Sequence, residues 1–105
     1  MLDSYVNEYI RERMAEKGFS NFHWEPVLIG VNAGETKLIG AYNEFYYLVT
    51  KTLPDGTIIT GDTHYLVAQD YANLTFARLH EFTGNIIIES PSAINIEFIK
   101  VIPEL

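Results

Sequence analysis

The stretch of this sequence that most constrains the fold runs from Lys37 to Gln69. Its two halves are dense in aromatic and β-branched residues, which fit a pleated, half-buried surface. Between them stands Leu53-Pro54-Asp55-Gly56, where proline sets φ for one turn position and glycine accepts a positive φ. This pattern predicts a long antiparallel hairpin around which the rest of the chain is arranged.

The first arm of this hairpin is apolar on both faces, because successive side chains of a strand point to opposite sides. One face carries Ile39, Ala41, Phe45, Tyr47 and Val49, and the other carries Leu38, Tyr42, Tyr46 and Leu48. We therefore expect other elements to cover this arm on both sides, at least in its middle. In the second arm, Gly61 predicts a bulge or a bend of a curved sheet.

An amphipathic helix is predicted from Asp3 to Lys17, ahead of the hairpin. Apolar side chains recur there at helical spacing, and charged side chains fill the opposite side. Gly18 fits the left-handed residue that follows a last helical turn, and Phe19 fits the apolar contact beside it. We expect the helix to end at this glycine and to pack its apolar side on a sheet.

Three further strands are predicted outside the hairpin. The first spans Asn21 to Val31, and Pro26, which lacks an amide donor, favours an edge position for that strand. Asn32-Ala33-Gly34-Glu35 is predicted to turn the chain into the hairpin. Near the C-terminus, Asn85 to Glu89 contains a short β-branched run. Ala93 to Ile102 is predicted as a last strand, because apolar and polar residues alternate from Ile94 to Phe98.

The stretch from Asp70 to Gly84 fits two structures. As a helix it begins after the cap Asp70 and ends at Gly84. As a strand it would place on one face Leu74, Phe76, Arg78, His80 and Phe82. We favour a helix over residues 71–83. The expected fold class is α+β: an N-terminal amphipathic helix packed on a curved, mostly antiparallel sheet of about five strands, with this second helix beside it.

Composition limits the class of protein further. A chain of 105 residues predicts a single domain spanning residues 1–105. It has no cysteine, which excludes disulfides, thiol nucleophiles and thiolate metal sites. No apolar run approaches the length of a membrane span, and the first residues lack the pattern of a signal peptide. These features predict a cytoplasmic protein.

The net charge of the chain is −7, from 14 acidic and 7 basic residues. An acidic surface repels nucleic-acid phosphates and anionic lipids, so we expect no direct binding to nucleic acid or membrane. It is compatible with a basic protein partner. A narrow form of this hypothesis is an acidic inhibitor of a nucleic-acid-binding protein, which would use the helix residues Glu8, Glu12 and Glu16.

Candidate ligand-binding residues come from the predicted hairpin, and they are Glu44, Tyr46, Asp62 and His64. The aspartate and the histidine share a strand face, and a metal site would need further ligands such as His80 or Glu81. An exposed polar pair is the simpler interpretation. No nucleophile elbow, phosphate-binding loop or dinucleotide fingerprint occurs in the sequence. We therefore predict no catalytic residue, metal or cofactor.

Seven tyrosines occur in the chain, and several cluster around the hairpin. They fit core and cross-strand packing, but aromatic residues are also enriched at interfaces. The candidate interface residues are Tyr42, Tyr47 and Tyr65.

The leading functional hypothesis is a non-catalytic binding or assembly protein acting through a sheet face or edge. Its partner would be another protein or a second copy, as in a small homo-oligomeric accessory protein of a bacterium or phage. The alternative is a small-molecule-binding protein or small enzyme, with its site between helix and curved sheet.

Overall fold

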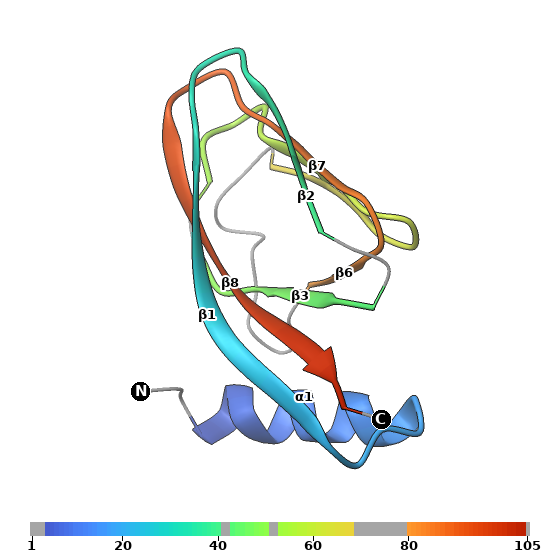
Figure 1. Cartoon of the computed structure of the whole chain (residues 1–105). Coiled ribbons are helices and arrows are strands. Elements are labelled where there is room, and N and C mark those ends of the chain that lie inside the picture. Colours follow the sequence, from blue (N-terminus) through green and yellow to red (C-terminus); the bar gives the residue numbers. More distant parts are fainter. Residues whose placement is uncertain (1–3, 41–42, 51–52, 69–79, 105) are drawn as a thin grey trace.

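The computed structural model describes residues 4–40, 43–50, 53–68 and 80–104. Within these residues the chain forms one helix and eight strands, arranged as two four-stranded antiparallel sheets (Figure 1). The elements are α1 (Ser4–Glu16), β1 (Phe22–Val31), β2 (Thr36–Ile39), β3 (Phe45–Leu48), β4 (Ile58–Thr60), β5 (Tyr65–Val67), β6 (Glu81–Thr83), β7 (Ile86–Glu89) and β8 (Ile94–Pro103). The protein is mostly β, so the predicted helix on one five-stranded curved sheet is wrong.

A bent two-stranded ribbon connects the two sheets. Sheet A has the strand order β1-β8-β3-β6, and sheet B has the order β2-β7-β4-β5. β1 pairs with β8 along its whole length, and beyond the corner β2 pairs with β7. At the corner the Gly34 N–H donates to the Ser90 carbonyl at 2.9 Å. Figure 1 shows this ribbon folding over so that the two sheets face each other.

The predicted long hairpin does not form, although its turn does. The Thr57 N–H donates to the Pro54 carbonyl at 3.1 Å, and Gly56 has a φ of 92°. This turn carries the chain from one sheet to the other, because β3 pairs with β6 and β8 while β4 pairs with β5 and β7. Gly61 lies in the turn of a short β4–β5 hairpin, where its N–H donates to the His64 carbonyl at 2.8 Å, and not in a mid-strand bulge.

The expectation that both faces of the segment around β3 are covered is confirmed. Tyr46 and Leu48 are buried in the core between the two sheets. Tyr47, on the opposite face, is buried beneath α1 together with Ile10 and Met14. A strand that is apolar on both sides thus lies in the interior of sheet A, with a layer on each face.

The long strands β1 and β8 change their buried face halfway along. Near the corner, Phe98 of β8 and Val31 of β1 belong to the core between the sheets. Towards the other end, Val101 of β8 and Trp24 of β1 belong to the cluster beneath α1. Figure 1 shows α1 crossing the end of the ribbon that lies far from sheet B. Two different layers therefore bury opposite faces of the same ribbon.

The predicted amphipathic helix is confirmed, and it ends as expected. Gly18 has a φ of 88°, and its N–H donates to the Ala15 carbonyl at 3.0 Å. The Phe19 N–H donates to the Met14 carbonyl at 2.9 Å, and the phenyl ring packs into the cluster beneath α1. These two bonds make the Schellman motif, which turns the chain back towards β1.

The predicted helix over residues 71–83 is wrong at its end, because Glu81–Thr83 forms β6; residues 71–79 lie outside the described residues. Phe82 alternates with Glu81 and Thr83, and it is buried in the core between the sheets, as strand geometry requires. The three strands predicted outside the hairpin are confirmed as β1, β7 and β8. Pro26 lies on an edge strand, since β1 borders sheet A.

Candidate functional site

A row of exposed apolar side chains crosses the outer face of sheet B. The strand register places Leu38 of β2 opposite Ile87 of β7, Ile87 opposite Thr60 of β4, and Thr60 opposite Tyr65 of β5. The side chains of Leu38, Ile87 and Tyr65 are 65%, 38% and 60% exposed. We call these four residues, one from each strand, the apolar row.

The next row on this face is also poor in charge. Thr36 lies opposite Glu89, which lies opposite Ile58, which in turn lies opposite Val67. Glu89 is the single charged residue of the two rows, and the Thr36 hydroxyl donates to its carboxylate at 3.4 Å. The outer face of sheet B is therefore an apolar surface with one carboxylate near its border.

The sequence produces this surface through the run Ile86-Ile87-Ile88. Because strand side chains alternate, Ile86 and Ile88 can both enter the core, whereas Ile87 must face the other way. In sheet A the second face is covered by α1 along part of the ribbon. Ile87 instead remains exposed, together with its cross-strand neighbour Leu38.

The strand edges are less suited to binding than this face. Lys37 on the edge strand β2 lies in the inward-facing row with Ile88, and an inward charge on an edge opposes strand addition. Pro26 lacks an amide donor on the edge strand β1. The other two edge strands, β5 and β6, have three residues each, which is too short for a long added ladder.

Leu28 provides a comparison within the same molecule. It is 67% exposed, much like Leu38, but it lies on β1 opposite the exposed Glu97. Isolated exposed leucines are common on protein surfaces, whereas contiguous apolar patches mark interaction sites. Leu38 thus differs from Leu28 in having the exposed Ile87 as its cross-strand neighbour, in a row that ends at Tyr65, and not in its exposure.

Of the predicted ligand-binding residues, Glu44 and Tyr46 contact each other. The Tyr46 hydroxyl donates to Glu44 Oε1 at 2.9 Å, and Lys100 Nζ lies 3.0 Å from Glu44 Oε2. Burial and, next, the hydrogen bond to Glu44 raise the pKa of the Tyr46 phenol. The protonated phenol of Tyr46 and the carboxylate of Glu44, which is paired with Lys100, thus form a structural contact between β3 and β8.

Asp62 and His64, the other two predicted ligand-binding residues, lie in the β4–β5 turn. His64 Nε2 and His80 Nδ1 are 2.8 Å apart, and the ring centroids are 5.0 Å apart with 22° between planes. This combination fits two rings joined edge to edge by an N–H···N bond. The pKa of His80 is lowered, mainly by burial and secondly by its electrostatic interaction with His64. Among the described residues, no hydrogen bond joins this pair to Glu44 and Tyr46.

Among the described part of the chain, no group of three or more histidine, aspartate or glutamate side chains is placed to hold a metal ion. Asp62, His64, His80 and Glu81, the residues considered for a metal site, thus form no such group in these residues. A shallow depression of about 270 Å³ lies at the corner end of the β1–β8 ribbon, lined by Gly30, Val31, Asn32, Ala93, Ile94 and Asn95. None of the predicted ligand-binding residues lines it.

The structure separates the predicted interface tyrosines. Tyr65 is exposed and belongs to the apolar row. Tyr47 is buried, and its hydroxyl donates to Glu81, so this residue is engaged inside the chain. Tyr42 lies outside the described residues.

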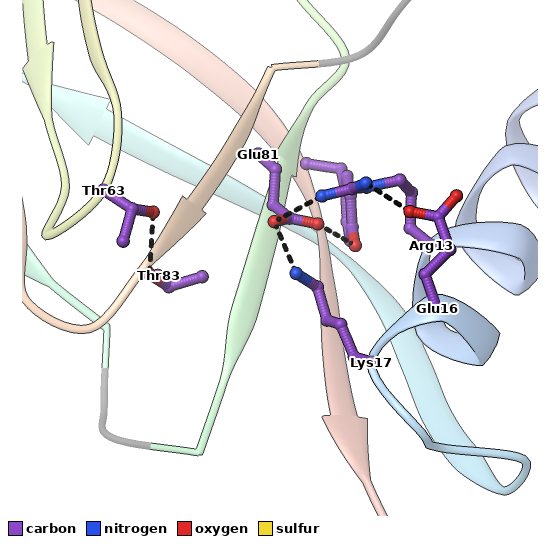
Figure 2. Close-up of polar contacts among 7 residues, drawn as sticks. Arg13, Glu16, Lys17, Thr63, Glu81 and Thr83 are labelled. Carbon is purple, nitrogen blue, oxygen red and sulfur yellow. Dashed lines mark hydrogen bonds and ion pairs between the residues drawn. The ribbon is translucent and has the colours of Figure 1, made fainter.

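A charged cluster that the sequence analysis missed attaches α1 to sheet A. The Glu81 carboxylate of β6 accepts a hydrogen bond from the Tyr47 hydroxyl. Its Oε1 atom lies 3.0 Å from Lys17 Nζ and 3.4 Å from Arg13 Nη2 (Figure 2). Burial on its own raises the pKa of Glu81, but the hydrogen bonds from Tyr47, Lys17 and Arg13 outweigh it and lower the pKa. The signal for this contact was the cross-strand pair of Tyr47 with Glu81, which depends on recognising β6 as a strand.

Comparison of the chain with protein-family models, with curated proteins and with solved structures finds no match. Within the described residues, no helix is long and apolar enough to cross a membrane. A functional proposal therefore rests on the geometry of the chain itself. The outer face of sheet B is the strongest candidate, because its large apolar side chains are exposed to water and do not pack in either core cluster.

Proposed function

We propose that this protein is a non-catalytic protein-binding module that acts through the outer face of sheet B. The observation that carries the proposal is the apolar row, in which Leu38, Ile87 and Tyr65 are exposed and only Thr60 stands between Ile87 and Tyr65. Exposed apolar side chains in a contiguous patch lower the free energy of the protein when a partner covers them.

The size of the face indicates a weak or transient contact unless the partner also touches its surroundings. The four strands of sheet B lie about 4.8 Å apart, and β2 and β7 have four residues while β4 and β5 have three; at about 3.4 Å per residue they span roughly 230 Å². A stable interface buries about 800 Å² on each partner. The apolar row is therefore the centre of an interface, and contacts beyond it must supply the rest.

An energy estimate leads to the same conclusion. Full burial of one large apolar side chain contributes about 1.5–3 kcal/mol. Covering the exposed parts of Leu38, Ile87 and Tyr65 then contributes roughly 3 kcal/mol in total, scaled by their exposed fractions. Association costs about 4–15 kcal/mol in lost translational and rotational freedom. Apolar contact with this row alone does not hold a partner, so polar contacts at its border are needed.

Site-specific photo-crosslinking in the cells that make the protein tests the proposal. A benzophenone amino acid is placed at position 38 in one variant and at position 28 in a control variant. Leu38 and Leu28 have nearly equal exposure, but only Leu38 belongs to the apolar row. We expect a discrete covalent adduct from position 38 and none from position 28.

The mass of the adduct shows whether the partner is another protein or a second copy. Adding Tyr65→Ser to the position-38 variant should reduce the adduct, because that change removes the other end of the apolar row. Equal adducts from both positions, or no adduct from position 38, would refute the proposed function.

A further inference from the structure

Three acidic residues lie on segments that meet at one end of sheet B, and the strand register places one of them, Glu89, on its outer face. Glu89 ends β7 on this face, and Glu35 directly precedes its neighbouring strand β2. Asp55 lies in the turn before β4, and a β-carbon added at Gly56 would be 3.2 Å from the Pro91 ring. The bond from the Gly34 N–H to the Ser90 carbonyl holds the segment with Glu35 beside the end of β7. We call Glu35, Asp55 and Glu89 the acidic end.

On the segments that form this end of sheet B, acidic residues outnumber basic ones. The acidic residues here number four, namely the three of the acidic end and Asp62, and the one basic residue is Lys37. This count covers residues 35–39, 55–67 and 86–92. Lys37 belongs to the inward-facing row of β2. Asp55 and Glu89 are exposed, and the Glu35 carboxylate accepts the Asn32 N–H at 3.0 Å. The border of the apolar row thus carries negative charge that these strands leave uncompensated.

The helix does not share this imbalance, although its glutamates suggested a binding surface. Residues 4–17 contain three acidic residues, Glu8, Glu12 and Glu16, and three basic residues, Arg11, Arg13 and Lys17. Arg13 also lies 2.6 Å from Glu16. The net charge of this segment is zero, so the acidic character of the described chain is stronger beside sheet B than on α1.

We propose that the partner is a different protein whose apolar contact surface is bordered by lysine or arginine side chains, which lie over the acidic end. This inference rests on the proposed function and names the chemistry of its partner. A second copy fits less well, because two copies, each with a net charge of −7, repel, and pairing through the same face would bring their acidic ends together. Oppositely charged borders around an apolar centre supply both the missing polar contacts and orientation.

The expected electrostatic contribution is modest and measurable. An exposed ion pair contributes about 0.2–1 kcal/mol, which corresponds to roughly a 1.4-fold to 5-fold change in Kd. Replacing one carboxylate of the acidic end by its amide should therefore weaken binding by about that factor. Because such pairs are screened over a Debye length of about 10 Å at 0.1 M salt, binding should also weaken as salt rises.

Three short synthetic peptides test the inference by titration into the ¹⁵N-labelled protein, followed by amide chemical shifts. In the first peptide, lysines alternate with valine and phenylalanine. The second replaces each lysine by glutamate, and the third replaces each apolar residue by serine. We expect the first peptide alone to shift the amides of β2, β4, β5 and β7, and to leave those of α1 unchanged.

Matched variants then identify the contacts. Glu89→Gln should raise the Kd of the first peptide by the factor above, whereas Glu8→Gln removes the same charge from α1 and should leave it unchanged. Leu38→Ser should weaken binding of the first peptide, whereas Leu28→Ser should not.

The outcomes separate the inference from the proposed function. If the glutamate peptide binds the same face as tightly as the lysine peptide, the charge inference fails while the apolar face remains a binding surface. If the serine peptide binds as tightly as the first, charge alone attracts it, and both the apolar face and the inference fail. Shifts confined to other elements, or no shifts with any peptide, also overturn both.

Discussion

Replacing Tyr47 by phenylalanine tests the contact that holds α1 on sheet A. Tyr47 of β3 is buried beneath α1, and its hydroxyl donates to the half-buried carboxylate of Glu81. Phenylalanine fills the same space without the hydroxyl, so the packing against Tyr9 and Met14 is retained. The variant therefore removes one hydrogen bond to a charged group and little else.

The magnitude follows from what remains around Glu81. A hydrogen bond to a charged group contributes about 1.5–3 kcal/mol. Lys17 and Arg13 still face the carboxylate in the variant, so Glu81 is not left unpaired in the interior. We therefore expect Tyr47→Phe to reduce the free energy of unfolding by about 1.5 kcal/mol, near the lower end of that range. This loss corresponds to a decrease in Tm of roughly 6–12 °C for a domain of this size.

Urea denaturation at neutral pH, followed by the fluorescence of Trp24, measures this change. Trp24 is the single tryptophan and packs in the cluster beneath α1, so its emission reports on the layer that the substitution affects. Tyr65→Phe is the control, because that residue is exposed on sheet B, and we expect a change within about 0.5 kcal/mol. Equal stability of Tyr47→Phe and the unmodified protein would refute the proposed contact of the hydroxyl with Glu81.

Three further predictions concern other parts of the fold. Because the pKa of His80 is lowered in the folded chain, its unfolded form takes up a proton first, and stability should fall as pH decreases below about 6.5; His80→Gln should lessen this loss in pH-dependent thermal melts. Gly40→Ala should destabilise the protein more than Gly34→Ala in urea denaturation. Both glycines have a positive φ, which costs an alanine roughly 1–2 kcal/mol. At Gly40 the added β-carbon would also lie 2.3 Å from the Gly84 carbonyl oxygen, whereas at Gly34 it would meet no atom within 4 Å. In the same assay, Ile87→Val should change stability by less than about 0.5 kcal/mol, whereas Ile88→Val, at the neighbouring buried position, should cost about 0.5–1.5 kcal/mol; equal effects would contradict the assigned faces of β7.

Elements whose signals are local were predicted from the sequence. The helix end at Gly18 follows from a glycine and an aromatic residue placed after an amphipathic stretch, and the Schellman bonds confirm it. Residues 94–98 alternate apolar and polar side chains, and β8 begins with them. In each case the conformation depends on residues within a few positions of one another.

The pairing of the strands was not predicted, because it depends on residues far apart in the chain. Residues 45–48 and 58–60 flank a good turn, and a hairpin satisfies every local signal there. The structure instead places β3 beside β8, about fifty residues later in the chain, because β3 needs a layer on each face. A two-strand hairpin alone offers no such layers, so tertiary packing overrides the local preference.

The candidate site shows the same division. Tyr65 was selected from the sequence as an aromatic residue of the hairpin, but Leu38, Thr60 and Ile87 were not recognised as its neighbours. They become one surface only when β2, β7, β4 and β5 are placed side by side in a defined register. Glu81 was likewise considered as a metal ligand, whereas the structure pairs it with Tyr47 and two cations.

The sequence by itself determined where α1 and most strands lie, the turns at Gly34 and Gly56, and that the protein is acidic. It also determined that alternate side chains of Ile86-Ile87-Ile88 must face opposite ways, because the repeat of a strand is two residues. Only the tertiary structure decided which of these faces is buried. That choice depends on which distant segment packs against the strand, and here the core took Ile86 and Ile88 while Ile87 remained in water.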